Sequence, residues 1–198
     1  MPRQTQAERS DATTTALVTA GLRLFGRDGY AATSIDAVAA AAGVTKGAAY
    51  HHFDGKAGLF RAVFVHQEEE LAKVLSRAAA AAPDSWAGLH AGCHAFLRQC
   101  LDPQVRRIIL LDGPAALGWD TVREIEYEYT LLRLRRGIDN ATADGFIAPV
   151  EPAISCQLIF GALCEAGMLL ARSADPTATL PKVIAEADRV LRSLTLLN

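Results

Sequence analysis

The segment from Thr45 to His52 carries the side chains with the clearest binding chemistry in the chain. Its hydrogen-bonding groups are two hydroxyls, an ammonium and two imidazoles, supplied by Thr45, Tyr50, Lys46, His51 and His52. Such groups bind phosphate oxygens, and they position a protein on a nucleic-acid backbone. Gly47 and Ala48 lie among them and are small enough to let the chain approach base edges in a major groove. The segment therefore indicates contact with double-stranded DNA.

A second group, His90, Cys93 and His94, has the residue types of a metal site. These positions are related as i, i+3 and i+4, so on a helix they share one face, with Cys100 nearby. Three nitrogen and sulfur ligands could hold zinc, but a closed site needs a fourth ligand that the spacing does not supply. Packing or pocket residues are the favoured interpretation, and no metal or other cofactor is predicted. A metal-sensing protein remains an alternative.

Sequence motifs of common enzyme classes do not occur. The chain contains no GxGxxG, no GxxxxGK[ST] and no GxSxG motif. Cys93 and His94 could pair only as a nucleophile and base, and adjacent residues on a helix point in different directions. We therefore expect a protein that binds rather than an enzyme.

Composition is typical of a globular protein. The 198 residues are 51% hydrophobic and 21% charged, with a net charge of −2, which excludes a disordered chain and a protein basic over its whole surface. The first 16 residues are polar, so we expect a cytoplasmic protein. The longest nearly apolar run, 158–171, is too short for a membrane span, and no membrane partner is expected.

Helical periodicity runs through the whole sequence, and no convincing alternating strand pattern appears. The predicted fold class is all-α, with a three-helix helix-turn-helix head and a helical body, about nine helices in all. The expected helices are 10–27, one opened by Thr33, 45–51, 56–81, 86–101, 104–111, 119–143, 152–171 and a final one from about residue 180. Helix 56–81 is long enough to link two domains.

The helices around residues 33–51 form a helix-turn-helix pattern. Glycine at the centre of Ala42-Gly43-Val44 lets the chain reverse between the helices. Thr33, with Asp36 three residues later, predicts the start of the first of these helices. Residues 1–60 contain six Lys and Arg against five Asp and Glu, so specific placement rather than bulk charge must carry DNA binding.

The last two helices predict a subunit interface. Helix 152–171 is apolar nearly all round, and the final helix has a single apolar stripe, a combination that suits a four-helix bundle between two chains. Burial of helix 152–171 within one chain is the alternative. The residues expected at the interface are Leu158, Gly161, Ala162, Glu165, Val183, Ala187, Leu191 and Leu194.

Residues 10–64 resemble the N-terminal domain of the TetR family of bacterial transcriptional regulators. The matching stretches are Ala20–Tyr30, Thr33–Ala39 and Ala42–Phe53, together with Lys56, Leu59 and Phe60. The resemblance implies an all-α homodimer with a DNA-binding head and a ligand-binding body. We accordingly expect a disordered tail at 1–9, a helix-turn-helix domain at 10–55 and a ligand-binding and dimerisation domain at 56–198.

The resemblance also implies roles for single residues of the head. Thr33 matches the phosphate-binding cap of the second helix, with Ser34 assisting it. Thr45 and Lys46 match the entrance of the recognition helix, and Gly47 and Ala48 match the positions closest to the bases. The phosphate-binding positions are matched by Tyr50, His51 and Lys56. The sequence departs from the family at Asp54-Gly55 and Gly58, which weakens the expected capping of the fourth helix.

The body carries candidate residues for an effector pocket. Aromatic walls with a few polar groups suit a small apolar or aromatic molecule, and the candidates are Trp86, His94, Phe96, Asp112, Trp119 and Tyr129. The function expected is a repressor that such a molecule releases from a pseudo-palindromic operator. The alternatives are a metal-sensing regulator and a DNA-binding protein of this fold without an effector.

Overall fold

The computed structural model describes residues 6–149 and 151–194, and all elements of regular structure in these ranges are helical. The helices are α1 (Gln6–Asp28), α2 (Ile35–Ala42), α3 (Lys46–His52), α4 (Gly55–Ala80), α5 (Ser85–Gln99), α6 (Pro103–Val105), the π-helix η1 (Arg106–Asp112), α7 (Gly113–Leu117), α8 (Trp119–Glu128), α9 (Thr130–Ala143), α10 (Pro152–Arg172) and α11 (Pro176–Arg192). The predicted all-α class is confirmed.

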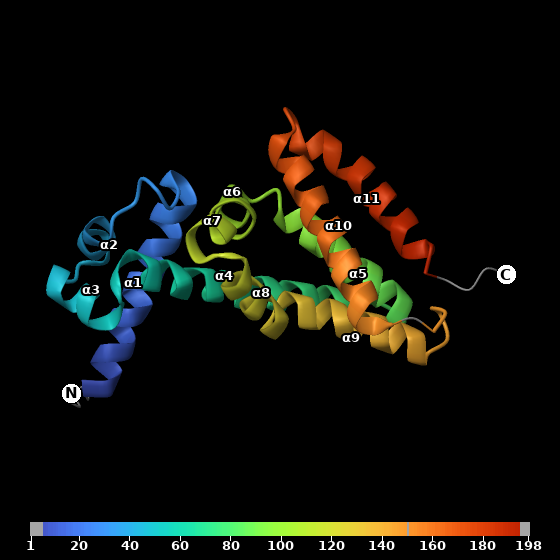
Figure 1. The fold of residues 1–198 in the computed structure, drawn as a ribbon, viewed down its shortest axis with the longest axis horizontal. Helices are drawn as coiled ribbons and strands as arrows, with labels where there is room; N and C mark the ends of the chain where they lie inside the picture. The colour runs from blue at the N-terminus through green and yellow to red at the C-terminus, as the bar shows by residue number, and fades with distance from the viewer. Residues whose placement is uncertain (1–5, 150, 195–198) are drawn as a thin grey trace.

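The head is made of α1, α2, α3 and the first half of α4, at the blue and cyan end of Figure 1. Its core contains Leu17 and Phe25 of α1, Val38 of α2 and Ala49 of α3, all fully buried. Phe25 and Phe60 meet edge to face, with ring centroids 5.0 Å apart. These contacts hold α3 against the rest of the head and leave its other side outward.

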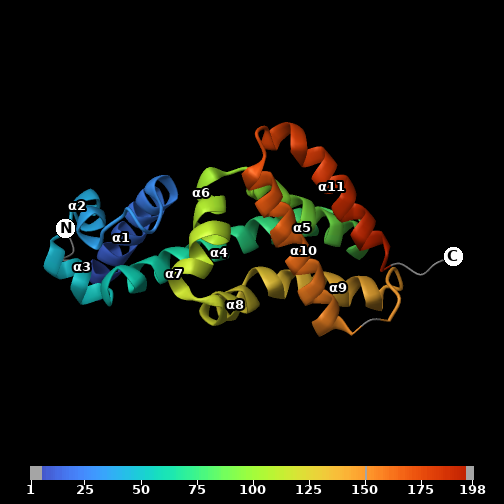
Figure 2. The ribbon, with the colours of Figure 1, turned by 45° about the horizontal axis from the view of Figure 1, so that its top comes forward.

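Helix α4 joins the head to the body, as both ribbon views show (Figures 1 and 2). Its N-terminal half contributes Leu59, Phe60 and Phe64 to the head-side core, and its C-terminal half contributes Leu71 and Leu75 to the body core. A continuous helix of 26 residues therefore belongs to both cores. Helix α4 therefore provides a continuous connection between the two cores.

Two boundaries at the N-terminal end differ from the prediction. Helix α1 begins at Gln6, so residues 6–9 of the expected tail are helical, and residues 1–5 lie outside the described part. Helix α2 is capped by Ser34 rather than Thr33, because the Ser34 hydroxyl accepts a hydrogen bond from the Ala37 amide at 3.1 Å. Hydroxyl groups at such a position satisfy the free amides of a first turn.

The middle of the chain is divided more finely than predicted. The helix expected at 104–111 becomes α6 and η1, and α7 follows directly. The helix expected at 119–143 is divided into α8 and α9 at Tyr129. The backbone angles of Tyr129, φ −116° and ψ −92°, are not helical. Periodicity could not reveal these divisions because the apolar pattern continues across them.

The body core lies between α4, α5, α9, α10 and α11. Its buried side chains include Leu97, Leu131, Ile138 and Leu170, each no more than 1% exposed. All four cysteines are free thiols, and burial raises the pKa of Cys93 to about 12. The thiols therefore stay protonated and pack as small apolar groups.

Helix α10 is long and apolar enough to cross a membrane, judged by length and composition alone. About 33% of its most apolar stretch is buried inside this chain, where it packs on α9, α11 and η1. Core helices of soluble proteins meet the same criterion. Helix α10 is therefore buried on one side and keeps apolar side chains exposed on the other.

Candidate DNA-binding, effector and dimer sites

Helix α3 is set by a tight turn after α2. Gly43 adopts a left-handed conformation, with φ at 69°, and the Val44 amide donates to the Ala39 carbonyl at 3.0 Å. Glycine adopts this conformation without strain. Thr45 then caps α3 through a hydrogen bond from the Ala48 amide to its hydroxyl at 3.1 Å. The helix-turn-helix is therefore present as a folded unit.

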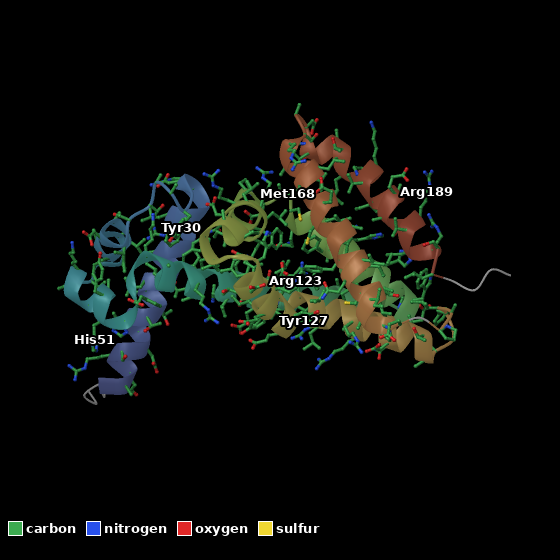
Figure 3. All side chains as sticks on the ribbon, in the orientation of Figure 1. Tyr30, His51, Arg123, Tyr127, Met168 and Arg189 are labelled. Atoms are coloured by element: carbon green, nitrogen blue, oxygen red, sulfur yellow. The ribbon has the colours of Figure 1, made fainter. Side chains whose placement is uncertain are left out.

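The outward side of α3 carries most of the residues that the sequence singled out. Thr45, Lys46, Gly47, Tyr50 and His51 are exposed, and Ala48 is half-buried. Figure 3 shows His51 at the end of the head away from the body. A Cβ built on Gly47 meets no atom of the described residues within 4 Å, so that position is open on the surface. The exposed residues form one surface that a DNA groove could meet.

Ion pairing and ring contacts hold part of this surface. The Lys46 ammonium lies 2.7 Å from a carboxylate oxygen of Asp36 on α2, which raises the lysine's pKa by hydrogen bonding and charge. It also lies 5.6 Å from the centre of the Tyr50 ring. His52 points inward, and its Nδ1 is 3.2 Å from the Thr14 hydroxyl of α1. These contacts fix the orientation of α3 on the head.

Thr33 does not fit the phosphate-binding role that the resemblance implied. Its side chain is only 4% exposed, and its hydroxyl donates to the Gly29 carbonyl at 2.9 Å. Ser34, which is exposed, holds the cap instead. Lys56 is half-buried, and its ammonium donates to the Tyr30 carbonyl at 2.9 Å, with the Tyr30 ring centre 4.3 Å away. Lys56 therefore ties α4 to the α1–α2 loop.

A cavity of about 340 Å³ lies in the body between α4, α5, α9 and α10. Its apolar walls come from Leu75, Leu89, Cys93, Phe96, Leu134, Phe160 and Leu163, and its polar groups from Ser76, Thr130, Arg133, Arg136 and Asn140. The volume is within the range of small-molecule pockets. Gly88 and Gly137 permit the close packing around it, since added Cβ atoms would lie 3.2 Å from the Ala79 carbonyl oxygen and 3.0 Å from Leu89.

Of the six residues predicted to line an effector pocket, only Phe96 lines this cavity. Trp119 is 66% exposed at the start of α8, so it forms no wall. Asp112 accepts a hydrogen bond from the Tyr30 amide at 2.7 Å and pairs with Arg107, at the contact between head and body. Tyr129 packs against the head-side core. Helical spacing alone could not place these side chains relative to a cavity formed by four helices.

Trp86 and His94, the remaining two candidates, lie on a face of α5 that packs toward α11. His90 Nδ1 and His94 Nε2 each lie 2.7 Å from the same Asp188 oxygen, Oδ1. The Trp86 ring meets His90 edge to face, with centroids 4.4 Å apart. Burial raises the pKa of Asp188, but hydrogen bonds from the two histidines outweigh it and bring the pKa below its usual value.

The zinc-ligand set considered from the sequence comes together only in part, as His90 and His94 without Cys93. Cys93 is buried and lines the cavity, and it is absent from the cluster of ligand atoms. Asp188 takes its place: ligand atoms of His90, His94 and Asp188 lie within 4.8 Å of one another. Because both histidines already hydrogen-bond the carboxylate, this cluster is explained as a tie between α5 and α11. The metal-sensing alternative loses the residue set on which it depended.

The exposed apolar side chains of α10 form a stripe on its outer side. Leu158 is 70% exposed, and Ile154 and Leu169 are also exposed. Gly161, Ala162 and Glu165 lie between them and are exposed too. With the exposed Val190 of α11 they form the outer α10 face, which borders a groove of about 330 Å³ between the two helices.

Four interface residues predicted on the last helix prove to be largely internal. Val183 and Leu191 are buried in the body core, and Ala187 and Leu194 pack partly against it. The apolar stripe of α11 therefore packs on α5 and α10 of its own chain. The four α10 residues predicted beside them, from Leu158 to Glu165, are exposed as an interface requires.

Two buried carboxyl groups escaped the sequence analysis. Glu68 of α4 is 1% exposed, and burial raises its pKa to about 8, although the Thr130 hydroxyl donates to it at 2.8 Å. Glu126 of α8 is also buried, and burial raises its pKa to about 7 against the lowering effect of Arg123. In the sequence, Glu68 is one of three consecutive glutamates, and no local pattern sets it apart from the other two. Only the packing of α8 and α9 over α4 distinguishes it.

Family comparisons agree with this architecture. A family model described as "Bacterial regulatory proteins, tetR family" matches residues 17–63, and one described as "Tetracyclin repressor-like, C-terminal domain" matches residues 86–194. Together the two matches cover most of the head and most of the body.

One solved structure extends the likeness over nearly the whole chain. A crystal structure of a TetR-family transcriptional regulator from Pectobacterium atrosepticum is 34% identical, with a TM-score of 0.82, covering 98% of this chain and 99% of that one. RolR in complex with resorcinol is 18% identical, with a TM-score of 0.71 over 97% of this chain and 99% of its own, which supports the fold alone. The transposon Tn10 TetC protein of Escherichia coli is 30% identical over 124 residues, which span 63% of this chain and 62% of TetC.

Proposed function

This chain belongs to the TetR family of transcriptional regulators, and from that premise we propose that it is a repressor released from its operator by a small organic molecule bound in the α4–α5–α9–α10 cavity. The observation that carries the proposal is the shared helix α4. It lines the cavity with Leu75, Ser76 and Ala79 and supplies Leu59 and Phe60 to the head core. We place the division between the DNA-binding and effector domains within this helix.

The DNA-binding surface consists of the outward residues of α3 with Ser34. Thr45, Lys46, Tyr50 and His51 supply hydrogen bonds, and Gly47 and Ala48 permit close approach of the backbone to the bases. Two such heads in a homodimer would enter successive major grooves about 34 Å apart. This arrangement predicts a pseudo-palindromic operator.

Release from the operator requires an effector that prefers one arrangement of α4 over another. The head also contacts η1 through Asp112, which accepts a hydrogen bond from the Tyr30 amide, and contacts α6 through Gln104, whose side chain donates to the Leu22 carbonyl at 2.5 Å. A ligand that shifts α4 relative to η1 would therefore strain contacts that hold the head in place. Separation of the two heads would change, and DNA affinity would fall.

The dimer is assigned to the outer α10 face, with α11 contributing its exposed side chains. The apolar stripe of Ile154, Leu158 and Leu169 is the surface that a second copy would bury in a four-helix bundle.

The DNA-binding head and the effector cavity fit a soluble, cytoplasmic regulator without enzymatic activity. The raised pKa of Cys93 supports that view, because a protonated buried thiol is a poor nucleophile.

Substitution of Lys46 tests the DNA surface. Lys46→Ala should weaken binding to DNA selected from a random library by the wild-type protein, by about 10-fold or more, because a phosphate or base contact contributes about 1–3 kcal/mol. Tyr50→Phe should weaken it through loss of a hydroxyl. Fluorescence anisotropy with labelled DNA measures both.

Lys73→Ala is the matched control, because Lys73 is an exposed lysine paired with Glu69 and Glu70 on the body half of α4. Circular dichroism should show all three variants equally helical. Wild-type affinity in a folded Lys46→Ala variant would remove that residue from the proposed contact surface.

A further inference from the structure

We propose that the effector is an organic anion, a largely apolar molecule whose carboxylate or equivalent group is bound by Arg133 on the wall of the cavity. The inference rests on the proposed function and specifies the chemistry of the cavity that the function requires. It follows from the charges on the cavity wall, from the partners those charges lack and from the apolar surface behind them.

Positive charge is concentrated on one face of α9. Arg133, Arg136 and Asn140 are related as i, i+3 and i+7, and all three line the cavity. Neither arginine forms an ion pair with any described residue. Arg135, their neighbour outside the cavity, is paired with Asp139, its Nε lying 3.5 Å from a carboxylate oxygen. The two arginines that line the cavity thus have no acidic partner among the described residues, whereas Arg135, outside the cavity, has one.

No acidic residue compensates this charge within the cavity, since none of the described lining residues is Asp or Glu. The carboxyl group of Glu68, outside the lining, accepts a hydrogen bond from the hydroxyl of the lining residue Thr130 at 2.8 Å. Burial raises the pKa of Glu68 to about 8, so at neutral pH it is mainly protonated and does not cancel the arginines. The wall of the cavity therefore carries a net positive charge.

Arg133 is placed to bind a ligand rather than to be satisfied by the protein. It is half-buried, and its Nε donates to the Ser76 hydroxyl of α4 at 3.2 Å. This bond uses one of the five donors of a guanidinium, and the Nη groups have no acceptor among the described residues. A carboxylate matches the fork of the remaining donors.

Most of the other lining residues are apolar and suit the body of such a ligand. Phe96 of α5 and Phe160 of α10 lie with their ring centroids 6.3 Å apart, and Leu89, Leu134 and Leu163 adjoin them. An anion held between Arg133 and Ser76 would touch α4 directly. The contact with Arg133 and Ser76 that selects an anionic ligand would then also act on α4, the helix that extends into the head.

Calorimetry with two probes of matched shape tests the inference. We expect the full-length protein to bind 2-naphthoate at least 10-fold more tightly than neutral 2-naphthamide at pH 7.5. Arg133→Gln should abolish this preference, weakening 2-naphthoate by about 10-fold and leaving 2-naphthamide within twofold. Arg135→Gln is the matched control and should keep the preference, because Arg135 lies outside the cavity.

A cavity-filling variant shows where the probes bind. A Cβ built on Gly92 meets no atom within 4 Å, so Gly92→Leu can project a side chain into the cavity without a backbone clash. It should weaken both probes. Equal affinity for the two probes, both lost in Gly92→Leu, would overturn the anion inference and leave the effector cavity standing. Failure of both probes to bind the wild type would also overturn it, whereas failure of the protein to select any DNA would overturn the proposed function.

Discussion

Leu158→Arg is expected to convert the protein from a dimer into a monomer without unfolding it. Leu158 is 70% exposed on the outer α10 face, so an arginine there costs the isolated subunit little. Within a four-helix bundle the same side chain would be buried against a second copy, where an unpaired charge is strongly unfavourable. Sedimentation equilibrium should report one subunit mass in place of two.

DNA binding should fall with the loss of the dimer. A monomer reads one half-site, and it loses the second set of phosphate and base contacts, so we expect affinity for the selected DNA to drop by more than about 100-fold. Trp119→Arg is the control, because Trp119 is similarly exposed on α8 and lies outside the outer α10 face. A Leu158→Arg protein that remains dimeric would place the interface elsewhere.

Leu191→Ala provides a contrast on the neighbouring helix. Leu191 is 1% exposed inside the body core. Its truncation should therefore lower the free energy of unfolding by about 2–5 kcal/mol, as for other buried leucines. Urea denaturation of both variants separates the two effects: Leu191→Ala should unfold more easily, and Leu158→Arg should keep the stability of a folded subunit.

Glu68→Gln is expected to remove much of the loss of stability that the wild type suffers between pH 5 and pH 8.5. The pKa of Glu68 is raised from 4.5 to about 8 by burial. Between these two values the folded protein retains a proton that the unfolded chain has released. The free energy of unfolding therefore decreases as the pH rises through this window, and becomes level again above about pH 8.

The size of this effect follows from the shift itself. At about 1.4 kcal/mol per pKa unit, the cost of burying Glu68 is on the order of a few kcal/mol at pH 8.5. A glutamine can still accept the Thr130 hydroxyl and does not ionise. Urea unfolding at pH 5, 7 and 8.5 should thus show a flatter profile for Glu68→Gln. Part of the decline should persist, since the pKa of Glu126 is also raised, to about 7.

Glu70→Gln is the control for this experiment, on the same helix and two residues away. Glu70 is exposed, and hydrogen bonding to Lys73 lowers its pKa. Its substitution should leave the decline between pH 5 and pH 8.5 in place. Equal pH profiles for the wild type and Glu68→Gln would show that Glu68 is ionised in the folded protein.

The head was the part of the molecule that the sequence predicted best. The turn at Gly43 and the cap at Thr45 depend on neighbouring residues, because a left-handed glycine and a capping hydroxyl act within one turn of the chain. The exposed side of α3 follows from the same local order, since Ala49 packs inward and Tyr50 lies outward. Thr33 is the exception, for its burial depends on the Gly29 carbonyl four residues earlier.

The effector site could not be predicted in the same way. Its walls come from four helices, and whether a residue of α5 faces the cavity or α11 depends on how these helices cross. Phe96 and His94 are two residues apart, yet one lines the cavity and the other hydrogen-bonds Asp188. In the sequence, nothing distinguishes Arg133 from the other arginines of its helix. Its contact with Ser76 depends on how α4 packs against α9.

By itself the sequence determined the helical class, the long helix α4 and the helix-turn-helix, because these depend on periodicity, caps and turns that act over a few residues. Tertiary structure alone decided which apolar stripe was internal and which was exposed. Helices α10 and α11 both read as interface helices, and the packing of α11 on α5 and α10 buried Leu191 and left Leu158 outside. Tertiary structure also buried Glu68 and left Arg133 without an acidic partner, since burial and charge compensation depend on residues far apart in the chain.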